Sequence, residues 1–463
     1  MKRLLLLGGL FLCFAFAFKQ YEKSSLEPSE KICNLPLNWE SSIGNVSFRT
    51  NVASLNGDIV IGSNGGNYMD YFLDKGNGIY VLDPITGKTK LTFANERFGD
   101  MDVNGVLVYN NNIYFGNDND EIICADSKGK ILFRQDASGD IEHRPILINT
   151  PTGDQIVFAM ETGEVRSINP TNGKINWTYY HPDFDGYKSS DSRTAFKLKM
   201  HFYSGDRFFL EPKLMDINND KINDLIYIAD GNDIHAIDGK NGKQLLRIKN
   251  DYPEEYYGTY HCNLFRTSPA LLQTKKGNFL MIPFWSRTEG EFSYEKTKNQ
   301  LRFYNLSGQE VKRIDLPNVH RTYSMTQKGN LVFFSNHCLD FSEGIDQFTI
   351  TQFDESIINK YSPPRVAEKS LTINGDECLI LSFEHGFKNH SEDPDSDDVF
   401  TSICIYNIRK KSFEQIHHTT VTSEFVPILG DFNKDGKADF LLGCHNGKLY
   451  NFDLGLDAKS INH

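Results

Sequence analysis

The 463-residue sequence lacks a basic excess, a cysteine framework and a long apolar run after its N-terminus. Lys and Arg total 49 against 61 Asp and Glu, so the net charge of −12 argues against a nucleic-acid-binding protein. Once Cys13 is set aside, the remaining cysteines are odd in number and scattered, which argues against full disulfide pairing. Beyond the first segment, no apolar run approaches the roughly 18 residues of a membrane span.

The N-terminus has the pattern of a signal peptide. Two basic residues precede the apolar run Leu4–Phe14, and the triplet Ala15-Phe16-Ala17 fits a small-x-small cleavage signal. We therefore expect a signal peptide over residues 1–17 and a secreted or periplasmic protein. A lipoprotein anchored through Cys13 is the alternative.

The rest of the chain is rich in aromatic residues and repeats itself. Phe and Tyr number 34 and 21, a content that favours strands. Each repeat has apolar strands, an Asp or Asn, a Gly-containing turn and an outer strand; the turn glycines are Gly87, Gly129, Gly173, Gly242 and Gly308. Four-stranded units of about 40 to 50 residues are typical of β-propellers. The pattern predicts an all-β propeller of about eight blades over residues 35–463, after a linker over residues 18–34.

The last repeat lacks an outer strand of its own. The segment Leu35–Ile43, which carries Trp39, can supply that strand, as Trp177 marks the outer strand of the third repeat. We therefore expect the N- and C-terminal segments to close the ring in one blade. A seven-bladed ring is the alternative, because the turns of the sixth repeat, Thr322–Tyr361, are degenerate.

Two loops have the oxygen spacing of calcium sites. Side-chain oxygens stand at positions 1, 3, 5 and 9 of each loop, as Ca²⁺ requires of a tight loop. A strand follows each loop and the closing glutamate of an EF-hand is missing, so an EF-hand is excluded. The predicted ligands are Asp216, Asn218, Asp220 and Asp224 in the first loop, and Asp431, Asn433, Asp435 and Asp439 in the second.

These motifs carry a family resemblance. Val426–Gly443 and Pro212–Ala229 resemble FG-GAP-type calcium-loop repeats, and the Asp-x-x-x-Gly-Lys turns resemble the blades of PQQ-like propellers. The resemblance covers most of residues 35–453 and implies the fold and structural calcium. It does not imply one activity, since propellers serve as scaffolds, lyases, hydrolases and dehydrogenases. Paired adjacent cysteines of quinoprotein dehydrogenases are missing from the sequence, which argues against a PQQ enzyme.

One face of a propeller carries the blade-to-blade connections, and here these contain His, Arg and Tyr residues. A lyase acting on uronic-acid polymers needs a cation to neutralise the carboxylate, a base and an acid. The candidate catalytic residues are His143, His201, Tyr203, Arg207, Tyr260, His261 and Arg266. Arg144 is a further candidate for the cation that neutralises the carboxylate.

Two functions follow from this inventory. The architecture is similar to that of the ulvan lyases, which implies a lyase that cleaves a uronic-acid-containing, ulvan-like polysaccharide by β-elimination. Together with the signal peptide, this leads us to expect an exported enzyme, and we expect it to be a monomer. The basic connection His181–Arg207 suits an anionic polysaccharide. The alternative is a non-catalytic exported propeller that binds glycan or protein partners. A zinc site is a further hypothesis, with ligands from His337, Cys338, His385 and His445.

Overall fold

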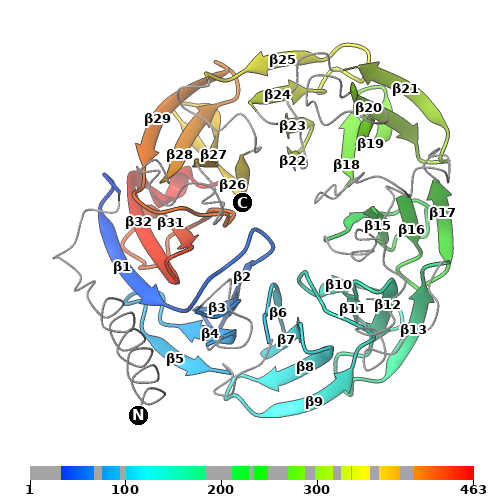
Figure 1. Ribbon diagram of the computed structural model, residues 1–463, viewed down its shortest axis with the longest axis horizontal. Helices are drawn as coiled ribbons and strands as arrows, with labels where there is room; N and C mark the ends of the chain where they lie inside the picture. Colours follow the sequence, from blue (N-terminus) through cyan, green and yellow to red (C-terminus); the bar gives the residue numbers. More distant parts are fainter. Residues whose placement is uncertain are drawn as a thin grey trace, which may run out of the picture.

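The computed structural model describes residues 33–66, 76–93, 101–182, 211–228, 234–248, 269–286, 298–315, 325–334, 336–354, 364–385 and 400–462. These residues form eight four-stranded antiparallel sheets arranged as the blades of a ring (Figure 1). The predicted all-β propeller with eight blades is therefore confirmed. No helix among the described residues is long and apolar enough to cross a membrane.

Blades 1 to 4 occupy the first half of the chain. Their strands, each set given from the inner to the outer strand, are β2 (Val52–Leu55), β3 (Asp58–Ser63), β4 (Gly78–Leu82) and β5 (Thr89–Thr92); β6 (Val106–Tyr109), β7 (Asn112–Asn117), β8 (Glu121–Asp126) and β9 (Ile131–Asp136); β10 (Ile146–Ile148), β11 (Gln155–Ala159), β12 (Glu164–Ile168) and β13 (Ile175–Tyr180); β14 (Lys213–Met215), β15 (Asp224–Ile228), β16 (Ile234–Ile237) and β17 (Gln244–Ile248).

Blades 5 to 8 complete the ring. Their strands are β18 (Ala270–Thr274), β19 (Gly277–Ser286), β20 (Lys298–Asn305) and β21 (Glu310–Asp315); β22 (Met325–Lys328), β23 (Leu331–Phe334), β24 (His337–Asp340) and β25 (Thr349–Gln352); β26 (Arg365–Ile373), β27 (Asp376–His385), β28 (Phe400–Asn407) and β29 (Ser412–His418); β30 (Ile428–Gly430), β31 (Lys437–Cys444), β32 (Lys448–Asp457) and β1 (Leu37–Ser42). A short 3-10 helix, η4 (Ala458–Ser460), follows β32.

The hydrophobic core is divided among the interfaces between neighbouring blades. Successive side chains of a strand point to opposite faces of its sheet, so one blade contributes to two interfaces. On β7, Ile113 and Phe115 pack toward blade 1, whereas Tyr114 packs toward blade 3. Because every sheet is buried on both faces, each blade needs both of its neighbours.

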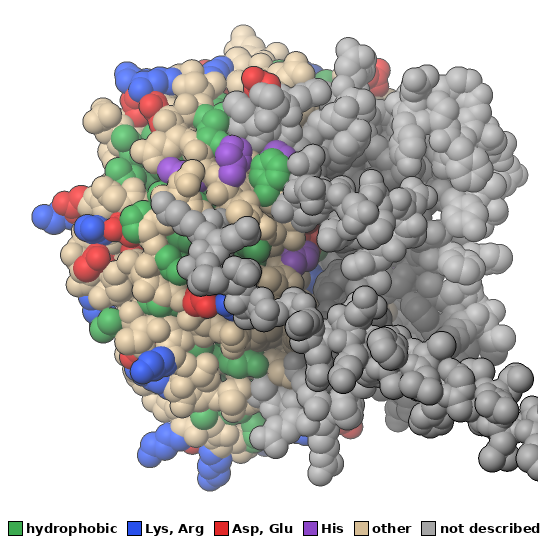
Figure 2. Space-filling model, turned by 60° about the vertical axis from the view of Figure 1, so that its left-hand side comes forward, with side chains coloured by type: hydrophobic (Ala, Val, Ile, Leu, Met, Phe, Trp, Pro, Cys, Tyr) green, Lys and Arg blue, Asp and Glu red, His purple; other side chains and the backbone are tan. Residues whose placement is uncertain are grey.

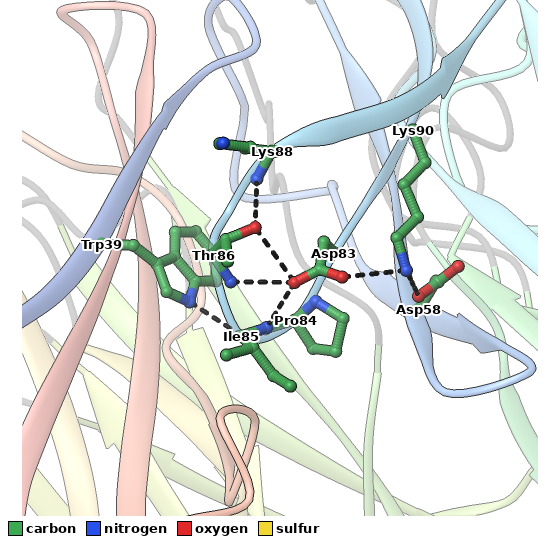
Figure 3. Close-up of polar contacts among 8 residues, drawn as sticks. All are labelled: Trp39, Asp58, Asp83, Pro84, Ile85, Thr86, Lys88 and Lys90. Atoms are coloured by element: carbon green, nitrogen blue, oxygen red, sulfur yellow. Dashed lines mark hydrogen bonds and ion pairs between the residues drawn. The ribbon is translucent and has the colours of Figure 1, made fainter.

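The ring closes as predicted, with β1 as the outer strand of blade 8. β1 pairs antiparallel with β32, and Trp39 lies opposite Asn451. Trp39 is buried, and its indole N–H donates to the carbonyl oxygen of Pro84 in blade 1 at 2.8 Å (Figure 3). Asn38 extends the closure, since its amide donates to the Asp439 carboxylate at 2.9 Å.

The Asp-x-x-x-Gly-Lys turn is built to receive that indole. The Asp83 carboxylate accepts the backbone N–H groups of Ile85 and Thr86 at 3.0 and 2.9 Å (Figure 3). Its hydrogen bond with Lys90, together with those N–H groups, lowers the pKa of Asp83 to about 2. Gly87 has a φ of +67°, and an added Cβ would lie 2.5 Å from Cε3 of Trp39. The turn therefore needs glycine for two independent reasons.

The same contact recurs between blades 3 and 4. There Trp177 on β13 covers Gly242, where an added Cβ would lie 2.4 Å from Cε3 of the indole. In blade 7, Lys411 takes the left-handed conformation, with a φ of 55°, in place of a glycine. The turn glycine is therefore a packing requirement of the blade interface where a tryptophan lies on it.

The structure adds details on the last blade, the sixth blade and the cysteines. β32, the third strand of blade 8, runs to Asp457. The sixth blade forms despite its degenerate turns, through β22 to β25. Cys33, Cys124, Cys338, Cys378, Cys404 and Cys444 are buried, as small apolar residues would be. Cys262 lies outside the described residues.

Substituting Gly87 by alanine tests the role of the indole contact. Gly375 is the matched control, because its φ of +82° imposes the same backbone cost while nothing lies within 4 Å of an added Cβ. We expect Gly375→Ala to cost about 1–2 kcal/mol from the left-handed backbone alone. Gly87→Ala should cost about 1–3 kcal/mol more, through overpacking against Trp39. Denaturant unfolding measures both values, and equal losses would contradict the argument.

Candidate functional site

The ring has two unlike faces. We call connection face the one formed by the blade-to-blade connections and the turns between second and third strands. The opposite turn face carries the turns between first and second and between third and fourth strands. This assignment follows from the strand order in each blade and places both predicted calcium loops on the turn face.

A buried polar network ties three connections together on the connection face. Asn104, which precedes β6, accepts hydrogen bonds from Ser47 at 2.9 Å and from Asn64 at 3.0 Å. Its own amide donates to Glu142 at 2.7 Å. Glu142 also pairs with Arg49 at 2.5 Å. Removing one partner of such a buried pair costs about 3–5 kcal/mol, so these segments are held firmly together.

Carboxylates surround this network. The pKa of Asp118 lies well above its usual range, first because of burial and then because of Glu142, Asp140 and Asp102 nearby. Arg49 opposes that rise. The Oδ1 atom of Asp118 is buried and has no hydrogen-bond partner within the part of the chain that the structure describes. Negative charge is therefore concentrated here beyond what one arginine offsets.

His143 is the described member of the predicted catalytic set. It lies in the connection before β10, whose first residue is Ile146. Its side chain is 2% exposed, and Nδ1 lies 2.8 Å from the carbonyl oxygen of Arg144. Burial lowers the pKa of His143, so the ring is neutral at pH 7. A neutral ring that donates from Nδ1 leaves Nε2 as an acceptor.

Arg144 pairs with Glu211 across the next connection. The two side chains lie 2.6 Å apart and are 37% and 40% exposed. Glu368 on β26, in the seventh blade, also raises the pKa of Arg144. The guanidinium is therefore already surrounded by carboxylates.

The other predicted catalytic residues fall outside the described residues. They are His201, Tyr203, Arg207, Tyr260, His261 and Arg266. Most of the basic connection His181–Arg207 falls there as well. Their proposed roles stay predictions.

The first predicted calcium loop joins β14 to β15. Oδ1 atoms of Asp216 and Asn218 both accept the N–H of Asp220, at 3.1 and 3.0 Å, so these two oxygens converge inside the loop. Asp224 is fully buried and accepts the N–H of Ile217 at 2.8 Å.

The second predicted calcium loop joins β30 to β31 and repeats this geometry. Asp439 is fully buried and accepts the N–H of Phe432 at 3.0 Å. Asp435 N–H donates to Asn433 at 3.1 Å, and Oδ2 of Asp431 accepts the N–H of Gly436 at 3.2 Å. The fourth and sixth positions have positive φ in both loops. These loops lie in blades 4 and 8, on opposite sides of the ring.

The predicted zinc ligands are dispersed. Cys338 is buried among apolar side chains, which raises the pKa of its thiol to about 12. His385 lies 2.8 Å from the Ser402 hydroxyl and stacks on Phe400. His445 is instead grouped with Glu384 and Glu424, a set that the sequence analysis missed because the three stand on separate segments.

The two faces differ in their content of basic residues among the described connections and turns. The described connections and turns of the connection face hold the basic residues Arg49 and Arg144. Their acidic residues are Asp102, Asp118, Asp120, Asp140, Glu142, Glu161, Glu211, Asp354 and Glu424. The described turns of the turn face hold the basic residues Lys88, Lys128, Lys130, Lys174, Lys221, Lys240, Lys243, Lys275, Lys276, Arg409, Lys410, Lys411 and Lys434. Their acidic residues are Asp83, Asp154, Asp216, Asp220, Asp238, Glu343, Asp346, Asp431 and Asp435. Figure 2 shows Lys and Arg side chains, with Asp and Glu side chains among them, along the left-hand edge of the molecule.

Comparison with known proteins agrees with the ring and its repeats. Residues 75–255 match the family model described as outer membrane protein assembly factor BamB. This stretch carries BamB-type propeller repeats. The structure of BamB from Moraxella catarrhalis is similar over 91% of this chain and 100% of that chain, with 10% identity and a TM-score of 0.50.

A second solved propeller structure is also similar to this chain. The Dos1 propeller matches over 91% of this chain and 96% of that chain, with 10% identity and a TM-score of 0.52. No curated protein matches the chain. These similarities show the fold and agree with the resemblance to PQQ-like propellers. They give no support to the similarity with ulvan lyases.

The carboxylate cluster predicts a stability that depends on pH. Because the pKa of Asp118 is raised in the folded state, stability falls as pH rises above about 4, by at most about 1.4 kcal/mol per unit. We expect Asp118→Asn to raise the melting temperature at pH 7 and to leave it unchanged near pH 3. Asp136→Asn, on the exposed outer strand β9, is the control and should change neither value. A variant that gains equally at both pH values would contradict the charge argument.

Proposed function

We propose that this chain is an exported, non-catalytic β-propeller scaffold whose connection face binds a basic segment of a partner protein. The observation that carries the proposal is the excess of acidic over basic residues in the described part of the connection face, whereas basic residues outnumber acidic ones on the turn face. A face rich in carboxylates attracts cationic segments and steers their approach. It repels an anionic polymer, so the described residues favour a protein partner over an anionic polysaccharide.

The other parts of the proposal have their own support. Export is supported by the signal-peptide pattern over residues 1–17. The BamB-type repeats of residues 75–255 support a scaffold. Rigid connections suit such a role, because a surface that is ordered before binding loses less entropy on association.

A second candidate is β-elimination on a uronic-acid polymer. It is favoured by the neutral ring of His143, whose Nε2 can accept a proton, beside the cation of Arg144. It ranks second because His143 is 2% exposed and Arg144 is paired with Glu211. A polymer can reach Nε2 of His143 only if this connection moves.

Binding of charged peptides tests the scaffold. A labelled octalysine peptide should bind the wild-type protein, and rising salt should weaken that binding. The double variant Glu161→Lys with Asp354→Lys, on the connection face, should weaken binding by about tenfold. The matched variant Lys128→Glu with Lys174→Glu, on the turn face, should not weaken it. Fluorescence anisotropy measures all of these affinities, with octaglutamate as the control peptide.

Three results would overturn the scaffold proposal. One is equal binding of octaglutamate, and another is full binding by the connection-face variant. The third is ultraviolet absorbance from an unsaturated sugar when wild-type protein is incubated with a uronate polymer, which would establish the second candidate.

We also propose that both turn-face loops bind structural Ca²⁺. The loops share their oxygen spacing and positive-φ positions, and hard oxygen donors suit this ion. The Oδ1 atom of Asp431 is buried without a hydrogen-bond partner in the described structure, which leaves it able to coordinate a cation. Asp439 receives the amide of Asn38, so an ion in this loop would strengthen the blade that closes the ring.

Chelation tests the calcium proposal. Ca²⁺ at about 100 times its Kd stabilises the folded state by about 2.7 kcal/mol, so EDTA should lower the melting temperature. Asp216→Asn with Asp431→Asn should remove the sensitivity to EDTA. The control is Asp126→Asn, which alters a turn carboxylate outside both loops and should keep it. A wild-type melting temperature that EDTA leaves unchanged would contradict the proposal.

A further inference from the structure

Three metal-binding side chains meet on the connection face of blades 7 and 8. One ligand atom each from Glu384, Glu424 and His445 lies within 4.8 Å of the others, and all three residues are half-buried. Among the described residues, this is the one group of three or more His, Cys, Asp or Glu that meets this distance. The residues come from the end of β27, the connection between blades 7 and 8, and the turn after β31.

Short hydrogen bonds fix the three segments relative to one another. The N–H of His445 donates to the carbonyl oxygen of Thr422 at 3.0 Å. The Ser423 hydroxyl donates to the carbonyl oxygen of Gly443 at 2.6 Å, and its N–H donates to the Thr401 hydroxyl at 2.8 Å. These bonds involve residues on the N-terminal side of Glu424. They join its connection to β31, which leads into His445, and to Thr401 on β28, which pairs with Glu384 on β27. The donor atoms are therefore held by the frame of the two blades.

The donor set points to a particular class of ion. Imidazole with carboxylates suits zinc and other first-row transition ions, whereas Ca²⁺ prefers six to eight oxygens. Burial lowers the pKa of His445, which keeps the ring in the neutral form that binds metals. Burial and Glu424 raise the pKa of Glu384 to about 7, and a cation between the two carboxylates would relieve that repulsion.

We infer that Glu384, Glu424 and His445 bind one Zn²⁺ ion, leaving a fourth position for water or an exchangeable ligand. Three protein ligands with one open position are the pattern of zinc sites that exchange a ligand. This inference replaces the set of His337, Cys338, His385 and His445 and keeps one of its members. It rests on these distances and is independent of the proposed partner protein.

Zinc titration of the full chain, first stripped with a chelator, tests the site. Calorimetry should show one Zn²⁺ per chain in the presence of saturating Ca²⁺. Glu384→Gln, Glu424→Gln and His445→Gln should each weaken binding by at least about 10- to 100-fold. Cobalt added in place of zinc should give a visible absorption band that the same variants lose.

Two controls separate this site from its neighbours. His385→Gln changes the adjacent histidine, which contacts Ser402, and should keep wild-type zinc affinity. Asp431→Asn changes a calcium loop on the other face and should keep it as well. Wild-type protein that takes up no zinc would overturn the inference, and so would His445→Gln protein with unchanged affinity. An equal loss in His385→Gln would also overturn it. Melting temperatures measured without metal confirm that each variant is folded.

Discussion

The pairing of β1 with β32 is the contact on which the ring depends. Each blade of this propeller is buried on both faces, so an open ring would expose two apolar sheets to water. β1 prevents this by completing blade 8 and by placing Trp39 on the turn of blade 1. Asn38 on the same strand reaches Asp439, so ring closure and the second predicted calcium loop share one hydrogen bond.

Local sequence signals predicted the architecture well. The turn glycines mark positions where the backbone needs positive φ or where an aromatic ring leaves no room for a Cβ. The need for positive φ is set by the turn itself, so the turns could be recognised from short stretches of sequence. Trp39 could be assigned to the outer strand of the last blade because Trp177 marks the outer strand of the third blade. The two predicted calcium loops could be recognised as a pattern because their predicted ligands lie within nine consecutive positions; calcium binding itself stays a prediction.

The connection face could not be predicted in the same way. Glu384, Glu424 and His445 come from three separate segments, so no residue spacing within one segment could predict that they lie together. The network around Asn104 also depends on which connections become neighbours in the ring. His143 has the right residue type for a base, but its burial is set by packing against Tyr227 in the next blade. These contacts and this burial depend on how the blades pack in the folded ring, which short sequence patterns do not specify.

The closing strand also sets an order of events for the chain. β1 is synthesised before every other strand of the eight blades, yet the strand that it pairs with lies about 400 residues later, as the contact between Asn38 and Asp439 illustrates. Closing so long a loop carries an entropic cost that is met only once the intervening blades are compact. The backbone N–H and C=O groups of β1 therefore stay without their β32 partners until the last blade has been synthesised and has folded. During that interval its edge is open to other chains, so the start of the sequence is where a newly made molecule is most vulnerable to aggregation.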